Sequence, residues 1–490
     1  MNTDLIIIGA GPGGYETAVR AAKAGLSVVV IEKQHLGGTC LNAGCIPTKC
    51  LCHSAESPIP SPSCAGRGED AEALLDEANA YLAAAIARKN EVVEKLKAGV
   101  AQLMKTPGIT LVEGEARFLD SHTVAVKKMD NGQLSIDNEF SAPNIIIATG
   151  SVTKFLPIPG AHAEGVVTST EMLNLATLPQ RLCIIGGGVI GLEFASIFQA
   201  LGSQVTVVEF CKEVLPQFDR DLAKRLRTSL KKRGIEFHTG AAAKEIRPLL
   251  PTSPRNGGGA EGATFPLPIT GEGREGGLCV DFEEKGKVQS VEADLVLMAV
   301  GRAANLDSLN LADVGIEVTP RGIVVDEHMQ TNVPGIYAIG DVNGLIQLAH
   351  AASAQGRVAL ASILKDTKDL KFLKFSKELI PSAVFTVPEA AMVGLTEEQL
   401  EEAGIEYQAH KTFYRANGKA LAMEADDGLV KILTDKEGKI LGCHILGAHA
   451  SDLIHEVTLA MRLGATIHDI ADTVHAHPSL SEILLAAAEA

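Results

Sequence analysis

A strand, a glycine-rich turn and a helix follow one another twice in this chain, and this repeated order constrains the fold more than any other feature. The first copy runs through the apolar segment 5–8, the glycines of 9–14 and a helical stretch that ends near Gly25. The second begins with the apolar segment 182–185 and repeats the order. Each copy continues into another apolar strand that ends in an acidic residue, Glu32 or Glu209. This order predicts two βαβ units of the kind that bind dinucleotides.

The glycines have a physical role in such a unit. Because they lack side chains, the backbone can approach a pyrophosphate, which rests on the unpaired N–H groups at the start of the helix. The positions are Gly9, Gly11 and Gly14 in the first copy and Gly186, Gly188 and Gly191 in the second. One such pattern could be a turn that binds nothing, but two in the same context favour two nucleotide sites.

The acidic residues indicate which nucleotides bind. Glu32 and Glu209 can each accept hydrogen bonds from the 2′-hydroxyl of an adenosine ribose. A carboxylate in this place repels the 2′-phosphate of NADP. The residues after Glu209 are Phe210, Cys211 and Lys212, which offer no cluster of basic side chains for such a phosphate. We therefore expect NAD, rather than NADP, as the second nucleotide.

Composition narrows the possible functions. A chain of 490 residues is too long for one ordinary core, so two or three domains are expected. The net charge of −16 argues against nucleic acid or anionic lipid as a partner. No apolar run reaches the ~20 residues that span a bilayer. The strand pattern begins at Leu5 without the lead-in of a targeting segment, so a cytoplasmic protein is expected.

Two stretches rich in Pro, Gly or Ser, 57–68 and 248–277, are expected to be inserted surface loops with little effect on the core. Residues 71–103 place apolar and charged side chains at helical spacing, which predicts a long helix. From residue 376 onward, strand candidates are followed by helical periodicity. This order predicts an α+β C-terminal domain.

Two cysteines, Cys40 and Cys45, stand in the segment 37–49, shortly after the first glycine pattern. A dithiol held beside a bound redox cofactor can pass two electrons between a thiol substrate and that cofactor. The pair could instead be two buried thiols or a zinc site. However, no second Cys or His pair stands at suitable spacing nearby, and we expect no metal.

The other cysteines are expected to be inert. Nine is an odd number and fits one reactive pair among reduced thiols better than a disulfide framework. Three lie close to the pair in sequence, and an auxiliary thiol among them is conceivable, although burial is the favoured interpretation: Cys50, Cys52 and Cys64. Four more are expected to fill apolar space: Cys183, Cys211, Cys279 and Cys443.

These residues and five further segments resemble the pyridine-nucleotide disulfide oxidoreductases, over nearly the whole chain apart from the two inserted stretches. The further segments are 148–150, 299–302, 331–341, 348–350 and 475–482. The resemblance implies an α/β fold with two Rossmann-like nucleotide-binding domains, one for FAD and one for NAD, and an α+β C-terminal dimerisation domain. The expected ranges are 1–150 for the first part of the FAD domain, 151–304 for the NAD domain, 305–375 for the return to the FAD domain and 376–490 for the dimerisation domain.

The resemblance also implies which residues contact the cofactors. Besides the first glycines, the FAD contacts are expected at Glu32, Thr39, Lys49, Gly114, Thr149, Gly150, Asp341 and Ala349. Asp341, at the end of a strand, would accept hydrogen bonds from ribityl hydroxyls. Besides the second glycines, the NAD contacts are expected at Glu193, Glu209, Ala243 and Gly301. An ion pair between Lys49 and Glu193 is expected near the flavin and the nicotinamide.

The implied activity is oxidation of dihydrolipoamide with reduction of NAD. Cys40 would face the substrate and Cys45 the flavin, and the two would form a disulfide in the resting enzyme. His477 would act as the base and Glu482 would orient its imidazole. The start of a helix near Cys45 and the nearby Lys49 would favour negative charge on Cys45.

The resemblance implies that the base comes from the partner subunit of a homodimer. The expected partners are therefore a second copy of the chain and a lipoyl-bearing protein of a multienzyme complex. His475 is expected to be structural, and His350 receives no catalytic role.

Three other interpretations stay open at the level of sequence. A related disulfide reductase could act on another thiol, but such relatives usually take NADP, and Glu209 counts against that nucleotide. A mercuric reductase would need a C-terminal cysteine pair that the chain lacks. A flavoprotein without redox activity could serve as a binding subunit, but both cysteines, His477 and Glu482 argue for an enzyme.

Overall fold

The computed structural model describes residues 1–56, 71–130, 133–249, 277–365 and 374–490. The chain divides into two compact units, each made of three segments. The first contains 1–47, 89–153 and 302–380, and the second contains 48–88, 154–301 and 381–490. The predicted loop at 57–68 and Cys64 lie outside the described residues. Among the described helices, none is both long enough and apolar enough to cross a membrane.

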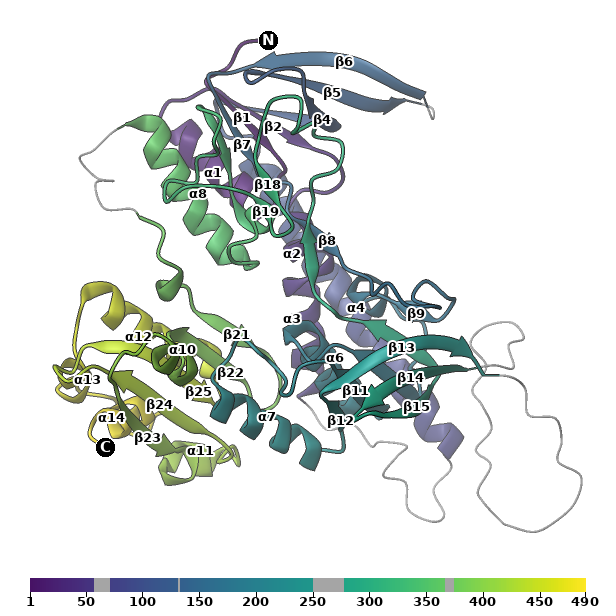
Figure 1. The fold of residues 1–490 in the computed structure, drawn as a ribbon, viewed down its shortest axis with the longest axis vertical. Helices are drawn as coiled ribbons and strands as arrows, with labels where there is room; N and C mark the ends of the chain where they lie inside the picture. Colours follow the sequence, from purple (N-terminus) through teal and green to yellow (C-terminus); the bar gives the residue numbers. More distant parts are fainter. Residues whose placement is uncertain (57–70, 131–132, 250–276, 366–373) are drawn as a thin grey trace, which may run out of the picture. The chain divides into compact units, whose positions relative to one another are not determined.

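The first unit is built on a parallel five-stranded sheet. Its strands, in spatial order, are β20 (Ile336–Ala338), β7 (Asn144–Ile147), β1 (Leu5–Ile8), β2 (Val28–Glu32) and β3 (Ile109–Glu113). Helices α1 (Pro12–Lys23) and α8 (Ala349–Leu364) pack against each other (Figure 1). Leu5 and Ile7 share a buried cluster with residues of these helices.

The opposite face of this sheet has its own cover. Ile6 and Ile8 share a buried cluster with an antiparallel sheet made of β4 (Glu115–Phe118), β5 (Thr123–Asp130) and β6 (Gln133–Ser141). Because successive strand residues point to opposite faces, an unbroken apolar run is what a strand covered on both sides requires. The smaller elements of the unit are β8 (Ser151–Thr153), β17 (Arg302–Ala304), β18 (Val318–Thr319), β19 (Gly322–Ile323), η2 (Gly340–Asn343) and η3 (Lys377–Leu379).

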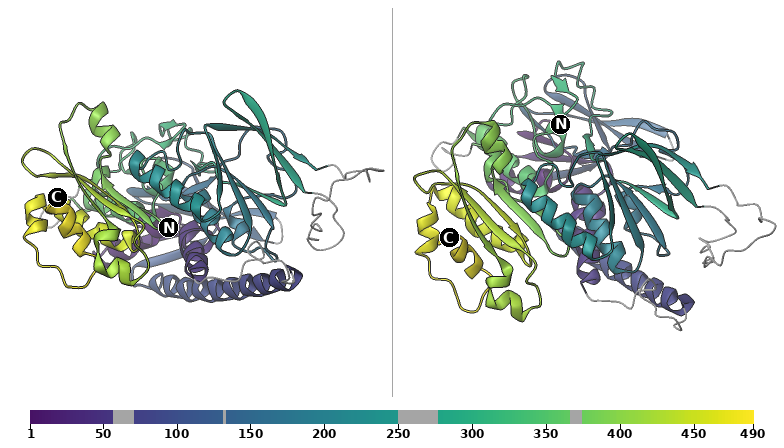
Figure 2. Two further views of the ribbon diagram at one scale, coloured as in Figure 1. Left: turned by 90° about the horizontal axis from the view of Figure 1, so that it is seen from below. Right: turned by 60° about the horizontal axis from the view of Figure 1, so that its bottom comes forward.

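Three helices follow β2 along the chain. They are α2 (Gly38–Ala43), α3 (Cys45–Ala55) and α4 (Ala71–Leu103). The bounds of α4 confirm the long helix predicted over 71–103, and Figure 2 shows it as one continuous helix. The start of α3 belongs to the first unit, and the rest of it, from Thr48, belongs to the second.

The second unit repeats the parallel sheet. Its strands, in spatial order, are β12 (Glu236–Thr239), β11 (Gln204–Glu209), β10 (Arg181–Ile185), β16 (Leu295–Met298) and β9 (Val166–Val167). The helices are α5 (Ser169–Met172), α6 (Val189–Ala200) and α7 (Arg220–Lys232), and an antiparallel sheet is formed by β13 (Ala241–Pro248), β14 (Leu278–Glu284) and β15 (Lys287–Ala293). Pro248, taken from the sequence as part of the insert, is the last residue of β13 and pairs with Leu278; residues 250–276 lie outside the description.

The C-terminal part of this unit is an antiparallel five-stranded sheet. Its strands, in spatial order, are β21 (Ser382–Val384), β22 (Ala390–Gly394), β25 (Ile440–Leu446), β24 (Leu429–Thr434) and β23 (Gln408–Phe413). The helical elements are α10 (Glu397–Glu402), η4 (Tyr414–Ala416), α11 (Gly418–Ala422), α12 (Ala450–Leu463), α13 (Ile467–Ala471) and α14 (Glu482–Ala488). Two parallel sheets, each with a glycine turn, and this α+β part confirm the predicted fold class.

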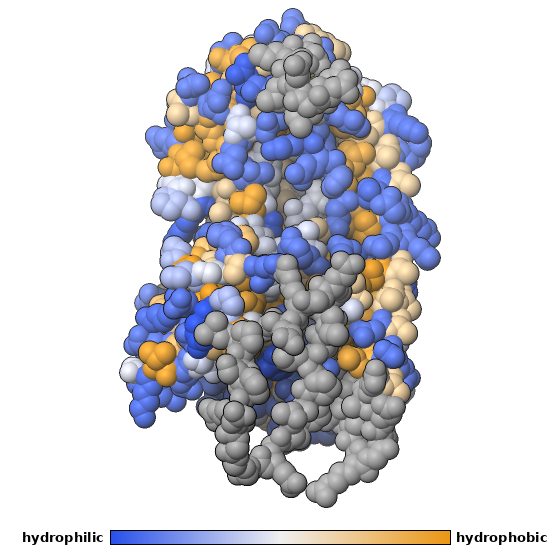
Figure 3. All heavy atoms as spheres, turned by 90° about the vertical axis from the view of Figure 1, so that its right-hand side faces the viewer, coloured by the Kyte–Doolittle hydropathy of each residue, from blue (hydrophilic) through white to orange (hydrophobic). Residues whose placement is uncertain are grey.

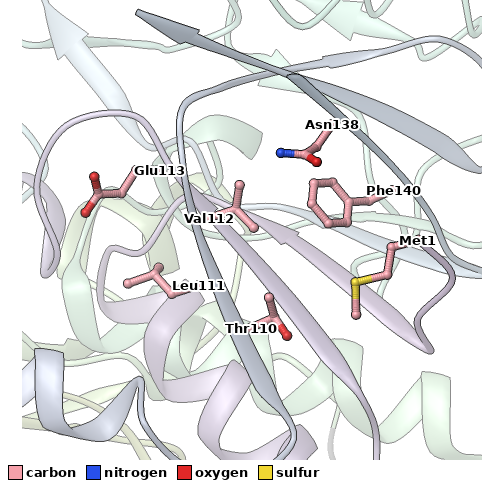
Figure 4. A pocket seen from close by; sticks show the side chains of 7 residues that line it. All are labelled: Met1, Thr110, Leu111, Val112, Glu113, Asn138 and Phe140. Atoms are coloured by element: carbon pink, nitrogen blue, oxygen red, sulfur yellow. The ribbon is translucent and has the colours of Figure 1, made fainter. Parts of the chain in front are cut away.

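The surface adds little that is specific. Figure 3 shows hydrophilic side chains interspersed with hydrophobic ones on one face. A pocket in the first unit lies between β3 and β6 and includes none of the predicted site residues (Figure 4). It is lined by Met1, Thr110, Leu111, Val112, Glu113, Asn138 and Phe140.

Candidate active site

The two glycine turns have nearly the same geometry. Helix α1 begins after Gly11 (φ −71°, ψ −178°) and α6 begins after Gly188 (φ −79°, ψ −173°). A glycine at this N-cap position brings no side chain to the N–H groups of the first helical turn, which an α-helix leaves without backbone partners. An anion such as a pyrophosphate fits these donors. Both turns therefore suit the dinucleotides expected from the sequence.

The acidic residues at the strand ends support the turns. The Glu32 carboxylate accepts hydrogen bonds from the backbone N–H of Ala10 at 2.7 Å and of Gln34 at 2.8 Å. The Glu209 carboxylate accepts them from Gly187 at 2.5 Å and Cys211 at 2.6 Å. Each carboxylate thus fixes the backbone of its glycine turn, a role that the sequence did not reveal.

Cys211 differs from the expectation for it. Whereas Cys183, Cys279 and Cys443 are buried, Cys211 is partly exposed, beside the Glu209 carboxylate. Burial and the negative charge of Glu209 raise the pKa of its thiol. The prediction that Cys211 fills apolar space is therefore wrong, because it follows the strand end instead of lying inside the strand. The neighbouring Phe210 is 77% exposed.

The two central cysteines lie at a tight junction of helices. Cys40 is in α2, and Cys45 is the first residue of α3. Between them, a Cβ atom on Gly44 would lie 3.0 Å from Thr39 O and 3.3 Å from Cys40 Cα, so the close return of the chain depends on glycine here. A thiolate at Cys45 would be favoured by the N-terminal end of α3, as the sequence predicted.

Asp341 belongs to a polar cluster in the first unit. It lies in η2, two residues beyond Ile339, and not at the end of strand β20 as the sequence suggested. Ser151 Oγ donates to Asp341 Oδ2 at 2.5 Å, and Arg302 Nε donates to Ser151 Oγ at 2.7 Å. Burial raises the pKa of Asp341, an effect that Ser151 and Arg302 oppose. The sequence showed Arg302 within a motif but gave it no role, and it gave none to Ser151.

The ion pair between Lys49 and Glu193 is confirmed. Lys49 Nζ lies 3.0 Å and 2.9 Å from the two carboxylate oxygens of Glu193. The Glu193 side chain is 3% exposed, and the backbone N–H of Phe385 also donates to it at 3.1 Å. Lys49 Nζ lies 4.5 Å from the centre of the Phe385 ring, a cation–π distance. The sequence did not reveal the role of Phe385, because that role depends on a contact with Glu193, 192 residues away.

The C-terminal pair has the geometry of an acid–base group. His477 Nδ1 lies 2.8 Å from Glu482 Oε1, and Ser479 N donates to Glu482 Oε2 at 2.8 Å. The hydrogen bonds from Ser479 and His477 lower the pKa of Glu482. The His477 side chain is 81% exposed, so its Nε2 can reach a partner molecule. The His475 side chain is 4% exposed and bonds to Glu456 and Thr473, in the structural role expected for it.

The other predicted contact residues lie at turns and element ends. Thr39 is in α2, Gly114 links β3 to β4, and Ala349 is the first residue of α8. Thr149 Oγ1 donates to Asn305 O at 2.7 Å, and Gly150 O accepts from Asn305 N at 2.9 Å. In the second unit, Ala243 lies in β13 beside a shift in pairing register, and Gly301 O accepts from Lys154 N at 3.0 Å. Among the described residues, no group of His, Cys, Asp and Glu could hold a metal ion.

Comparison with known proteins adds independent evidence. Residues 3–356 match the family model described as pyridine nucleotide-disulphide oxidoreductase, and residues 380–488 match the dimerisation domain of the same family. The dihydrolipoyl dehydrogenase of Bacillus subtilis is 40% identical over 495 residues, covering 100% of this chain and 96% of that protein. The dihydrolipoyl dehydrogenase 1, mitochondrial, of Arabidopsis thaliana is 38% identical, covering 99% of this chain and 90% of that protein.

A solved structure is also similar along the whole chain. The Cu(II) complex of the HOCl-induced flavoprotein disulfide reductase RclA from Escherichia coli matches with a TM-score of 0.81 and 31% identity. The match covers 100% of this chain and 99% of that one.

Proposed function

Because this chain belongs to the pyridine nucleotide-disulphide oxidoreductase family, we propose that it oxidises dihydrolipoyl groups to lipoyl groups and reduces NAD. The family, the oxidoreductase class and the cofactors FAD and NAD expected from the sequence are confirmed. The observation that carries the substrate is the 40% identity to a dihydrolipoyl dehydrogenase over the full chain, with Cys40, Cys45, His477 and Glu482 in place.

When bound, FAD would pass two electrons from the reduced dithiol to NAD. The first glycine turn, with Gly9, Gly11, Gly14 and Glu32, would hold the FAD. Further FAD contacts are proposed at Thr39, Lys49, Gly114, Thr149, Gly150, Asp341 and Ala349. For NAD they are proposed at Gly186, Gly188, Gly191, Glu193, Glu209, Ala243 and Gly301. The domain ranges given above, 1–150, 151–304, 305–375 and 376–490, are part of the proposal.

The chain's own residues carry out the thiol exchange. In the oxidised protein Cys40 and Cys45 share a disulfide, and a substrate thiol attacks the sulfur of Cys40. The Cys40–Cys45 bond breaks, a mixed disulfide forms, and Cys45 leaves as a thiolate. The second substrate thiol then displaces Cys40, so the substrate gains a disulfide and the protein holds two reduced cysteines.

His477 handles the protons of this exchange. Its Nδ1 faces Glu482, which favours the tautomer with the proton on Nδ1 and leaves Nε2 free to accept a proton from the substrate thiol. The charge of Glu482 then stabilises the imidazolium. Glu482 is in turn held by the backbone N–H of Ser479.

The second half of this site would come from another subunit. The chain carries the family's dimerisation domain, which supports a homodimer. We propose that His477 of one subunit serves Cys40 of the other, in keeping with its exposed imidazole. The macromolecular substrate would be a lipoyl-bearing protein of a multienzyme complex. A cytoplasmic location remains a prediction from the sequence.

Two measurements test the proposal. Anaerobic reduction with dihydrolipoamide is expected to produce a long-wavelength charge-transfer band from the Cys45 thiolate to the flavin. Cys45→Ser is expected to abolish this band. Absence of the band from the unaltered protein would overturn the disulfide mechanism. Steady-state rates are expected to favour NAD over NADP, and a preference for NADP would overturn the role given to Glu209.

A related reductase with another thiol substrate is the second candidate, favoured by the likeness to a flavoprotein disulfide reductase. The same assay separates the two. A dihydrolipoamide rate far below that with a glutathione-like thiol would favour this candidate.

A further inference from the structure

A buried lysine joins two distant parts of the second unit. Lys431 lies on β24 of the C-terminal sheet, and its side chain is 0% exposed. Its Nζ donates to Asp219 Oδ1 at 2.6 Å and to a carboxylate oxygen of Glu397. Asp219 directly precedes α7 and lies 212 residues away from Lys431 in the chain. The ion pair therefore ties the dimerisation domain to the part of the chain that carries the second glycine turn.

One oxygen of Asp219 serves two contacts. Asp219 is the N-cap of α7, and its Oδ1 accepts from the backbone N–H of Leu222 at 3.2 Å as well as from Lys431. Lys431 thus fixes where α7 begins and where the segment before α7 ends. Removal of two charges from water offsets much of their attraction. A buried pair of this kind is therefore explained better by the position it fixes than by the stability it adds.

The segment that ends at Asp219 packs on the second glycine turn. It consists of residues 210–219, here named the cover segment, and follows Glu209 at the end of β11. Leu215 N donates to Gly187 O at 2.9 Å, and a Cβ on Gly187 would lie 3.1 Å from Val214 Cγ1. Val214 and Leu215 are both buried. The cover segment is thus in direct contact with the turn.

The cover segment depends on support from α7. Leu215 has a φ of +46°, in the left-handed region that a leucine adopts only where surrounding contacts hold it. One support is Glu213, whose carboxylate binds Arg227 of α7 at 2.6 Å and 2.9 Å. A second is the bond from Lys431 to Asp219. Both supports require that α7 is correctly placed.

We propose that Lys431 is a positioning residue for the NAD site: it holds Asp219, and so keeps the cover segment in the conformation that receives the nucleotide at the second glycine turn. This inference rests on the proposed function, since it takes that turn to be the NAD site. A segment that is ordered in advance does not lose its freedom when the nucleotide binds, so the affinity for NAD is higher. The effect falls on NAD binding and leaves the thiol exchange unchanged.

The test measures the dissociation constant of NAD and amide hydrogen exchange in the flavin-loaded protein. Lys431→Met keeps an apolar side chain at this place and removes the charge. It is expected to raise the dissociation constant and the KM for NAD about 10-fold while kcat stays within about twofold. Exchange in residues 210–219 is expected to become faster before any NAD is added, because the bond from Leu215 N to Gly187 O is then broken more often.

A second variant keeps the test decisive, because Lys431→Met leaves the carboxylates of Asp219 and Glu397 buried without their cation. Asp219→Ser retains a residue type that caps helices well, and Lys431 keeps Glu397 as its anionic partner. Its shorter side chain breaks the tie to Lys431. This variant is expected to raise the dissociation constant of NAD about fivefold, with the same faster exchange in 210–219. Should Lys431→Met not fold, Asp219→Ser decides in its place.

Ile432→Ala is the matched control. Ile432 follows Lys431 on β24, points to the opposite face and belongs to a buried cluster with residues of α12 and α14. The substitution costs stability in the same sheet without touching Asp219. It is expected to lower Tm but to leave NAD affinity and exchange in 210–219 unchanged. If Ile432→Ala and Asp219→Ser raise the dissociation constant equally, lost stability is the cause and the inference is wrong.

The failure of this inference and that of the proposed function are distinguishable. A protein that oxidises dihydrolipoamide with NAD, but whose Asp219→Ser variant binds NAD as tightly and exchanges as slowly as the unaltered protein, retains the function and loses the inference. If the protein oxidises another thiol instead, NAD affinity and exchange still decide the inference, because neither measurement uses the thiol substrate.

Discussion

The two glycine turns share one close approach of the backbone. An added Cβ atom at Gly14 would lie 1.9 Å from Gly9 O in the first turn, and one at Gly191 would lie 2.0 Å from Gly186 O in the second. Both turns accept a backbone bond from a later segment, Gly37 N to Ala10 O and Leu215 N to Gly187 O, each at 2.9 Å. The two turns differ at the next layer out. In the first, that segment also approaches the N-cap glycine, because a Cβ on Gly38 would lie 2.8 Å from Gly11 Cα. In the second, a Cβ on Gly188 would meet nothing described within 4 Å.

The difference shows how the same glycine turn can serve two kinds of nucleotide site. The segment that carries the cysteines packs against the first turn at Gly38, so the FAD proposed to bind there would lie beside the residues that react with it. In the second turn, no described residue lies within 4 Å of a Cβ placed on Gly188, which suits the proposed NAD, a nucleotide that would enter and leave in each cycle. The same glycines thus fit a retained cofactor in one unit and an exchanging one in the other.

The largest effects are expected when equivalent glycines of the two turns are substituted. Gly14→Ala and Gly191→Ala create the same backbone clash and should each disrupt their turn by more than about 3 kcal/mol. Gly14→Ala is expected to purify with less than about a tenth of the normal flavin. Gly191→Ala is expected to keep its flavin but to raise the KM for NAD more than about 100-fold. Flavin absorbance per protein and NAD kinetics measure both.

The matched control for these variants is Gly99→Ala, because a Cβ at Gly99 in α4 meets nothing described within 4 Å. It should change neither quantity. Loss of flavin from Gly191→Ala to the same extent as from Gly14→Ala would show that the two turns are not separate in function.

The next test removes the carboxylates. Glu209→Ala leaves Gly187 N and Cys211 N without their acceptor and is expected to raise the KM for NAD about 10-fold at unchanged flavin content. Glu32→Ala is expected to speed flavin release while the KM for NAD stays the same. Stopped-flow flavin release and steady-state kinetics check the pair, and an unchanged KM in Glu209→Ala would contradict the comparison.

A third test uses acid. Burial lowers the pKa of His444 in the second unit from 6.5, although Asp219 opposes the shift. The unfolded state then binds a proton below pH 6.5 that the folded state does not, so stability falls as the pH drops, by up to about 1.4 kcal/mol per pH unit. In the first unit, burial raises the pKa of Asp341, so that protonation of this group on acidification favours the folded form.

Hydrogen exchange between pH 7 and 5.5 should therefore show protection falling first in β25 and α7 and later in β1 and β7. His444→Gln, whose amide can still donate to Leu395 O as His444 Nε2 does at 3.0 Å, is expected to remove most of this dependence. Equal loss of protection in both units would refute the assignment.

The smallest effect concerns Phe210, which is 77% exposed beside the open turn. Phe210→Ala is expected to change the free energy of unfolding by less than about 0.5 kcal/mol and the KM for NAD by about two- to threefold. Val288→Ala, at 73% exposure in the same unit, is the control and should change neither. Thermal melts and NAD kinetics give both numbers.

The parts of this molecule that the sequence predicted are those with a local signal. The bounds of α4 follow from helical spacing, the two turns follow from the order of strand, glycines and helix, and the pair of Lys49 with Glu193 follows from family motifs. The cluster of Ser151, Arg302 and Asp341 had no such signal.

Its members are up to 190 residues apart. Ser151 and Arg302 meet because two short strands pair, and Asp341 joins them from η2. The wrong expectation for Cys211 has a local cause. The sequence placed the strand end at Glu209, as the structure does, but it did not show that burial is already lost two residues beyond that end.

The end of β13 has a consequence for how such a chain can change. Leu249 N bonds to Gly277 O at 2.8 Å, so the chain leaves and re-enters the hairpin of β13 and β14 at neighbouring points. The entropy of closing a loop between fixed ends grows only slowly with its length. The sequence between these two points can therefore be lengthened, shortened or replaced in evolution without changes in core packing. A protein engineer can use the same place to insert a tag or a reporter.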